Sequence, residues 1–161
     1  MIIKNFELDK INIKNFNLFL FYGDNQGFKD EIVEKICEQK NLKKTLFFEK
    51  KVLSNIENFL NSISTKSFFE NEKIIVIKNA TDKLKEMINE IYELQNSDIT
   101  VILISDLLDK KSKLRNFFEK TNNVICIPFY PDEHKSLNMI ANNFFKKKGI
   151  KISQQTINLI I

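Results

Sequence analysis

The first long apolar run of the chain is followed by a loop that holds residue types found in phosphate sites: Gly23-Asp24-Asn25-Gln26-Gly27-Phe28-Lys29-Asp30. A phosphate-binding P-loop has the pattern G-x-x-x-x-G-K-[ST], in which backbone amides cradle the phosphates, the lysine neutralises them and the hydroxyl holds Mg²⁺. Here three residues separate Gly23 from Gly27, Phe28 stands between Gly27 and Lys29, and Asp30 replaces the hydroxyl. The two aspartates of the loop would repel a triphosphate. We therefore expect Gly23, Gly27 and Lys29 to form a degenerate P-loop that binds no ATP.

A hydrolytic NTPase also needs a carboxylate at the end of its third strand, and the sequence does not supply one. The third apolar run, Ile74–Ile77, is followed by Lys78-Asn79-Ala80. Asp106 follows a later run, where a turn or a helix cap explains it better than catalysis does. The single histidine, His134, stands among charged residues, and no His/Cys cluster has the spacing of metal ligands. We expect no catalytic residue, no metal, no cofactor and no intrinsic enzymatic activity.

Two adjacent phenylalanines, Phe68 and Phe69, interrupt a polar stretch just before the third apolar run. On a turn or at a helix end, neighbouring side chains point about 100° apart, so the two rings do not enter one core together. One interpretation places one ring in the core and leaves the other partly exposed. The other makes the pair an aromatic plug for a partner's pocket, as at interface hot spots.

Apolar runs of strand length alternate with helical patterns along most of the chain. Unbroken β-branched runs suit strands covered on both faces, which is typical of a parallel sheet. The expected strands are Leu18–Tyr22, Thr45–Phe48, Ile74–Ile77, Ile99–Ile104 and Val124–Ile127. Apolar spacings of three and four predict helices over about 26–40, 53–63, 84–91 and 114–118. This order predicts a doubly wound α/β domain over residues 1–130, with helices on both faces of a parallel sheet.

The pattern becomes purely helical after Pro128 and Pro131. Asp132 could cap a helix that stops at Gly149, and Ser153 could begin another. That last helix has no stop signal before the sequence ends. We therefore expect residues 131–161 to be the beginning of a second, helical domain.

Three consecutive lysines, Lys146, Lys147 and Lys148, end the first of these helices and fit two interpretations. Lysines at a helix C-terminus interact favourably with the helix dipole, so a solvated helix end accounts for them. A basic cluster is also a candidate contact for DNA phosphates.

Composition limits the class of protein. The 161 residues carry 25 Lys+Arg and 21 Asp+Glu, a formal charge of +4, which is weak support for a nucleic-acid partner. The abundance of Lys, Asn, Ile and Phe indicates A/T-rich codons and hence a bacterial genome low in G+C. Two cysteines, Cys37 and Cys126, make no disulfide framework, and we expect buried thiols. With no signal peptide pattern and no apolar run long enough to span a bilayer, we expect a cytoplasmic protein without a membrane partner.

Four pieces of the chain, taken in order, resemble the delta subunit of the bacterial DNA polymerase III clamp loader. They extend over essentially all of the sequence, and their order and spacing are more specific than any one piece. The pieces are Leu20-Phe21-Tyr22-Gly23-Asp24 with Phe28, Ser67 through Asn79, Leu108 through Leu114, and Phe144 through Ser153.

The resemblance implies an AAA+ domain with a degenerate nucleotide site, followed by the start of a small helical lid domain, with the family's collar domain absent. It implies a subunit of a DNA polymerase holoenzyme that neither binds nor hydrolyses ATP. The implied partners are the sliding clamp (the beta subunit), the other loader subunits (gamma or tau, and delta prime) and primer–template DNA through the complex. Two alternatives remain: a P-loop NTPase with an unusual loop, and a DNA-binding module that uses Lys146, Lys147 and Lys148.

The resemblance also implies a site. In this family, adjacent apolar residues before the third strand insert into a hydrophobic pocket of the clamp. By motif position these are Phe68 and Phe69, presented by the turn at Ser67, with Phe68 in place of the commoner leucine. A subunit that binds the open clamp better than the closed clamp shifts the ring toward opening by that difference in affinity.

Overall fold

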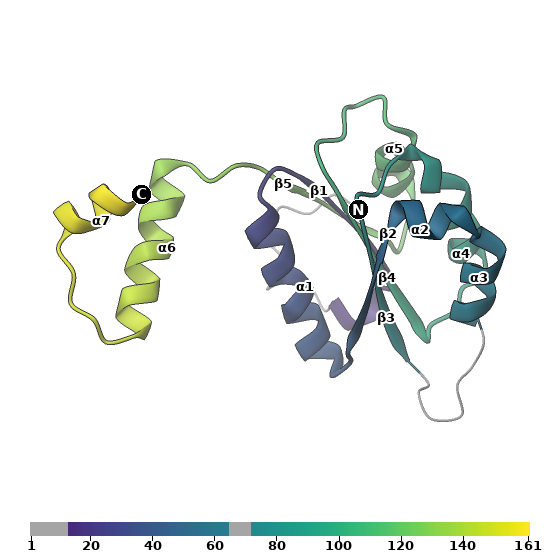
Figure 1. The fold of residues 1–161 in the computed structure, drawn as a ribbon, viewed down its shortest axis with the longest axis horizontal. Helices are drawn as coiled ribbons and strands as arrows, with labels where there is room; N and C mark the ends of the chain where they lie inside the picture. The colour runs from purple at the N-terminus through teal and green to yellow at the C-terminus, as the bar shows by residue number, and fades with distance from the viewer. Residues whose placement is uncertain (1–12, 65–71) are drawn as a thin grey trace. The chain divides into compact units, whose positions relative to one another are not determined.

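A computed structural model describes residues 13–64 and 72–161 of the chain. It divides into two compact units, one ending at Phe129 and the other running from Tyr130 to Ile161. The first unit holds a sheet, and the second consists of two helices (Figure 1).

The sheet of the first unit has five strands, all parallel, in the order β2-β3-β4-β1-β5. The predicted parallel α/β architecture is therefore confirmed. Its central strand β4 is also its longest, and every residue of β4 is buried. The strands are β1 (Leu18–Gly23), β2 (Lys44–Phe48), β3 (Lys73–Lys78), β4 (Ile99–Ser105) and β5 (Ile125–Phe129).

Helices cover both faces of this sheet, as the unbroken apolar runs predict (Figure 1). Successive side chains of a strand point to opposite faces, so Phe19 and Phe21 enter one core and Leu20 and Tyr22 the other. The first core is covered by α1 (Gln26–Lys40) and the short turn η2 (Ile13–Asn15). The second is covered by α2 (Glu49–Ser54), α3 (Ile56–Ser64), η3 (Asp82–Leu84), α4 (Lys85–Glu93) and α5 (Lys113–Lys120).

The helix predicted over 53–63 is wrong in one respect, because the structure has two helices there. The first, α2, begins earlier, at Glu49, and ends at Ser54. The helical conformation is interrupted at Asn55, and α3 begins at Ile56. The side-chain oxygen of Asn55 accepts a hydrogen bond from the Asn58 amide at 3.0 Å, as a helix N-cap does. Apolar spacing carries through the break because both helices turn the same face to the sheet, so the pattern alone does not reveal it.

The segment before α4 contributes two helix caps, Thr81 and Asp82. Thr81 accepts from the Lys83 amide and begins η3. Asp82 instead reaches a helix far along the chain, where its carboxylate accepts hydrogen bonds at the start of α5 from Ser112 Oγ, the Lys113 amide and the Leu114 amide.

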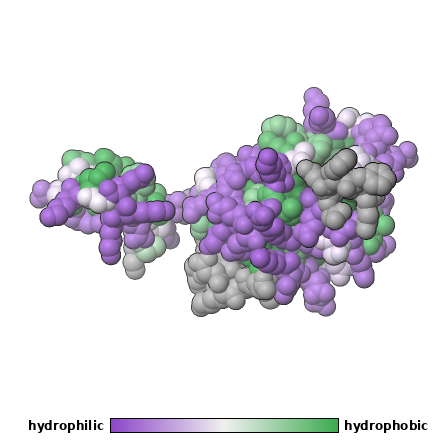
Figure 2. Space-filling view, turned by 90° about the horizontal axis from the view of Figure 1, so that it is seen from below, coloured by the Kyte–Doolittle hydropathy of each residue, from purple (hydrophilic) through white to green (hydrophobic). Residues whose placement is uncertain are grey.

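The second unit contains α6 (His134–Lys147) and α7 (Gln154–Ile160). Gly149 has φ +68° and ends α6 as expected, with its amide bonded to the Lys146 carbonyl. The Asp132 cap is wrong: the N-cap is Glu133, and Asp132 accepts from the Ser136 hydroxyl in the first turn. Figure 2 shows apolar and polar residues sharing the surface of this unit. Among the described residues, no helix is both long enough and apolar enough to cross a membrane.

Candidate functional site

The carboxyl ends of β1, β3 and β4 form the corner of the sheet where a P-loop protein holds nucleotide. The turn from β1 to α1 is short: β1 ends at Gly23 and α1 begins at Gln26. Gly23 has φ +120°, and a Cβ at this residue would lie 2.1 Å from the carbonyl oxygen of Phe129 in β5. Only glycine fits this close passage of two strands, so Gly23 has a structural role whatever the loop binds.

Several backbone amides at the start of α1 already have acceptors within the chain. The Gln26 amide donates to the Asp24 carbonyl at 2.8 Å, and the Lys29 amide to the Asn25 carbonyl at 3.1 Å. Asn25 is the N-cap of α1, and its side-chain oxygen accepts from the Phe28 amide at 3.1 Å. A P-loop instead keeps such amides free to cradle phosphate.

Lys29 occupies the corner itself. Counted from Gly23, it is the seventh residue, which is the lysine position of G-x-x-x-x-G-K, and Phe28 stands at the second glycine position. The correspondence is hard to see in the sequence, because Gly27 comes one residue before the position of the second glycine in the motif. The ammonium of Lys29 donates to the Gly23 carbonyl at 2.7 Å and to the Ser105 carbonyl at 2.9 Å, and the residue is 1% exposed. The group that would neutralise phosphate therefore bridges the ends of β1 and β4.

Burial lowers the pKa of Lys29 below its ordinary value of 10.5, and the carboxylates of Asp106, Asp24 and Asp30 offset part of that effect. The last of these carboxylates also lies 3.1 Å from the Lys78 ammonium at the end of β3. Burial by itself would raise the pKa of Asp30, but hydrogen bonds from Gln26 and Lys78 outweigh burial and hold this pKa below its ordinary value.

A lysine thus stands at the end of β3, where a hydrolytic NTPase has an acid. Asp106, beyond β4, is exposed, and its carbonyl accepts from the Gly23 amide at 3.2 Å. The Ser105 hydroxyl donates to the Ala80 carbonyl. Sequence reasoning missed Lys78 and Ser105 as members of this corner, although the position of Lys78 after an apolar run was a usable signal. Within residues 13–64 and 72–161, no three His, Cys, Asp or Glu side chains are grouped to hold a metal ion.

The two cysteines are buried free thiols, as expected. Burial raises the pKa of Cys126 to about 12, and burial also raises the pKa of Cys37. Both thiols are thus in the apolar surroundings typical of structural cysteines.

The predicted clamp contact, Ser67, Phe68 and Phe69, lies outside the described residues. The described chain reaches Ser64 at the end of α3 and resumes before β3. The interpretation of the two phenylalanines therefore stays a prediction from the sequence and the resemblance.

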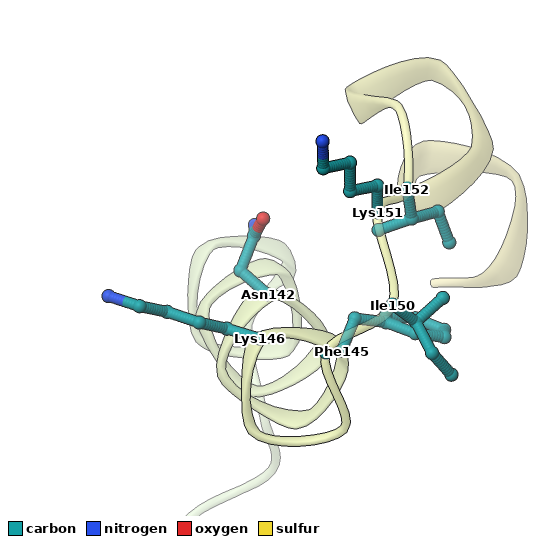
Figure 3. A pocket seen from close by; sticks show the side chains of 7 residues that line it. Asn142, Phe145, Lys146, Ile150, Lys151 and Ile152 are labelled. Atoms are coloured by element: carbon teal, nitrogen blue, oxygen red, sulfur yellow. The ribbon is translucent and has the colours of Figure 1, made fainter.

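The predicted DNA contact lies at the end of α6, where Lys146, Lys147 and Lys148 are all exposed. Lys146 lines an open pocket of about 390 Å³ together with Lys151 and Asn142. In Figure 3, Lys146 extends away from α6, and the side chain of Lys151 extends from the loop that follows the helix. From Tyr130 to Ile161 the sequence has five lysines and two acidic residues, so most of the chain's net charge belongs to this unit.

Asn142 does not complete an anion site in this pocket. Its amide nitrogen donates to the carbonyl and side-chain oxygens of Asn138, at 2.9 and 2.8 Å. The remaining lining is apolar, with Phe145 pointing toward Ile150 (Figure 3). The pocket has the positive charge of its lysines, but the side-chain amide of Asn142 is already bonded within the helix. This combination suits a weak phosphate contact more than a specific one.

Comparison with known proteins finds similar folds among solved structures. No family model matches the sequence, and no curated protein matches it. Among solved structures, the DNA clamp loader delta protein of Bacillus subtilis (YqeN) is similar with a TM-score of 0.61 and 14% identity, over 88% of this chain and 46% of that chain. Domain III of the replication initiation protein DnaA from Thermotoga maritima is similar with a TM-score of 0.53 and 16% identity, over 97% of this chain and 72% of that chain.

This chain therefore spans about half the length of the clamp loader delta protein that it matches. At such low identities the likeness establishes the architecture and leaves the activity open. The likeness shows the fold, a five-stranded parallel sheet flanked by helices.

Proposed function

We propose that the chain is a non-catalytic, AAA+-like subunit of a bacterial clamp loader that binds the sliding clamp and promotes its opening during replication. One observation carries the proposal: in a fold shared with a clamp loader delta protein, the P-loop lysine is bonded to the protein's own Gly23 and Ser105 carbonyls. A subunit that has lost the nucleotide corner but kept the fold is suited to binding a partner rather than to hydrolysis.

The proposed contact is made by Phe68 and Phe69, with Ser67 in the turn that presents them. Two aromatic side chains can each bury on the order of 150–250 Å² in a partner's pocket, which is enough to anchor an interface. Clamp opening then follows from a difference in affinity, because a subunit that binds the open ring more tightly shifts the equilibrium by that difference. Nucleotide-binding subunits of the assembled loader would control when the contact is available.

The test is binding to a purified bacterial sliding clamp, measured by surface plasmon resonance. Phe68→Ala with Phe69→Ala should weaken binding at least roughly 30-fold, since loss of a hot-spot side chain costs about 2 kcal/mol or more. A matched control removes an exposed apolar pair elsewhere, Leu46→Ala with Phe48→Ala on β2, where the side chains are 47% and 51% exposed. Circular dichroism checks that both variants fold. Equal binding by both variants would contradict the assignment of the site.

DNA contact by Lys146, Lys147 and Lys148 is a second candidate, favoured by the excess of lysine in the second unit. Binding of a labelled duplex should then fall steeply with salt, and replacing the three lysines by glutamine should reduce the slope of log K against log salt. A slope unchanged by the replacement would show that these lysines do not contact the DNA phosphates.

A further inference from the structure

A groove of about 1010 Å³ lies at the amino ends of β2 and β3, at the opposite edge of the sheet from the Lys29 corner. Its walls come from the loop after α1, the start of β2, the end of α3 and the start of β3. Apolar side chains form part of the lining: Ile63 and Ile75 are buried, and Phe47 is half-buried. The groove is at the upper end of the size range of small-ligand pockets and suits a short stretch of polypeptide.

Within residues 13–64 and 72–161, the charged residues that line this groove are nearly all of one sign. Four are lysines, Lys40, Lys43, Lys44 and Lys73, and one, Glu72, is acidic. Concentrated charge of one sign beside low-dielectric walls focuses an electrostatic field and attracts groups of the opposite sign. The groove therefore selects an anionic ligand with some apolar surface.

Three of the lysines, Lys40, Lys44 and Lys73, have partners within the chain, and the carboxylates of Glu72 and Glu34 offset part of the positive charge. Lys44 pairs with Glu34 of α1, but both side chains are solvated, so this pair is weak. Lys40 donates to the side-chain oxygen of Asn17 at 3.1 Å, a neutral acceptor. Lys43 is exposed.

The aromatic ring in the groove argues for polypeptide over single-stranded nucleic acid. Single-strand binding grooves combine positive charge with aromatic faces on which bases stack. Among the lining residues that the structure describes, Phe47 is the aromatic one, and its ring already packs edge-to-face with Phe59 at 5.2 Å and lies under the Lys51 ammonium at 6.0 Å. The other apolar groups of this described lining are aliphatic, as in sites that receive aliphatic side chains.

We propose that this groove is a docking site for an acidic segment of a partner protein, in which carboxylates pair with the lysines and an aliphatic side chain packs near Ile63 and Ile75. A second copy of this chain is a poor occupant, because each copy carries a net positive charge. The inference does not use the predicted contact at Phe68 and Phe69, and its test contains no clamp. Each proposal can therefore fail without the other.

The test uses a short synthetic peptide rich in glutamate with two leucines, titrated into isotopically labelled full chain and followed by NMR. We expect saturable shifts at Lys43–Phe47, Ser62–Ile63 and Lys73–Ile75, and weaker binding as salt is raised. Two control ligands are titrated in the same way: a peptide with lysine in place of glutamate, and oligothymidylate as a single-stranded nucleic acid. Shifts confined to residues 146–151, tighter binding of oligothymidylate at this groove, or no shift with the acidic peptide would each overturn the proposal.

Variants with matched charge changes separate the groove from general polyanion attraction. Lys43→Gln with Lys44→Gln should weaken peptide binding roughly tenfold. Lys110→Gln with Lys111→Gln changes the same charge at exposed positions outside the groove and should leave binding within about twofold. Thr45→Tyr fills the groove from an exposed strand position without a charge change and should also weaken binding. Equal losses in the two charge variants would mean that no specific groove is used.

Discussion

The ammonium of Lys29 lies 2.7 Å from the carbonyl oxygen of Gly23, six residues earlier in the chain, and both atoms are buried. A second bond, to Ser105 at 2.9 Å, ties the first strand of the fold to the fourth. A charge-assisted hydrogen bond of this kind is stronger than a neutral one, and without Lys29 the two buried carbonyl oxygens would lose this donor. The lysine that binds phosphate in a P-loop here joins the ends of two strands of the sheet.

Nucleotide titration tests the functional consequence. We expect no saturable binding of ATP with Mg²⁺ by calorimetry up to roughly 1 mM, because the amides of Gln26, Phe28 and Lys29 and the Lys29 ammonium already have partners within the chain. A P-loop ATPase of known affinity serves as the positive control. Micromolar saturable binding would favour the alternative of an NTPase with an unusual loop.

Gly23→Ala should lower the free energy of unfolding by about 3 kcal/mol, because alanine is strained at φ +120° and its Cβ would collide with the Phe129 backbone. Urea denaturation measures the change. Gly27→Ala is the matched control: nothing lies within 4 Å of its added Cβ, and a helical alanine should stabilise by about 0.5–1 kcal/mol. Similar effects at the two glycines would refute the role assigned to Gly23.

Lys29→Met should destabilise the protein by about 1–3 kcal/mol at neutral pH, since two buried carbonyls lose their donor. Lys110→Met, at an exposed position, should change stability by less than about 0.5 kcal/mol. Equal urea midpoints for the two variants would show that the Lys29 bridge contributes nothing.

The pH dependence gives an independent readout of Lys29. The folded pKa of Lys29 is below the ordinary 10.5, so the unfolded chain binds more protons between the folded value and 10.5. The stability of the unmodified protein should therefore rise with pH in that window relative to Lys29→Met. The pKa of Lys40 is also lowered by burial, but this residue is present in both proteins and cancels in the difference. Parallel stability curves would indicate that the pKa of Lys29 is not perturbed.

Asp82→Ala should lower the free energy of unfolding by about 1–2 kcal/mol at pH 7, as loss of a helix cap does. Burial alone would raise the pKa of Asp82, but hydrogen bonds from Ser112, Leu114 and Lys113 outweigh burial and lower it below 3.8. The stabilisation is therefore complete above pH 3.8 and is lost as pH falls through the lower folded pKa.

The control for this cap is Glu86→Gln, at a side chain that is 82% exposed, and it should have little effect at any pH. Thermal unfolding of the three proteins across the acidic range provides the comparison. A destabilisation by Asp82→Ala that persists unchanged at the lowest pH would contradict the cap assignment.

The sequence by itself determined the elements that depend on local spacing. Unbroken apolar runs such as Ile74–Ile77 indicated strands buried on both faces, and the bounds of α1 were predicted residue for residue. Gly149 marked the end of α6 because a positive φ is a local requirement. The departure of the 23–30 loop from the P-loop pattern is also visible in the sequence, since it depends on residue types at short range.

Only the tertiary structure decided contacts that depend on strand order. Ser105 lies 76 residues from Lys29, and the two meet because β1 lies beside β4. The need for glycine at position 23 arises from Phe129 in β5, which no local pattern encodes. The basic groove likewise assembles residues from three separate segments of the sequence, 40–47, 62–63 and 72–75. Local spacing determines which face of an element is buried, but a site built across a sheet depends on which strands become neighbours, because side chains distant in sequence meet only after the strands have paired.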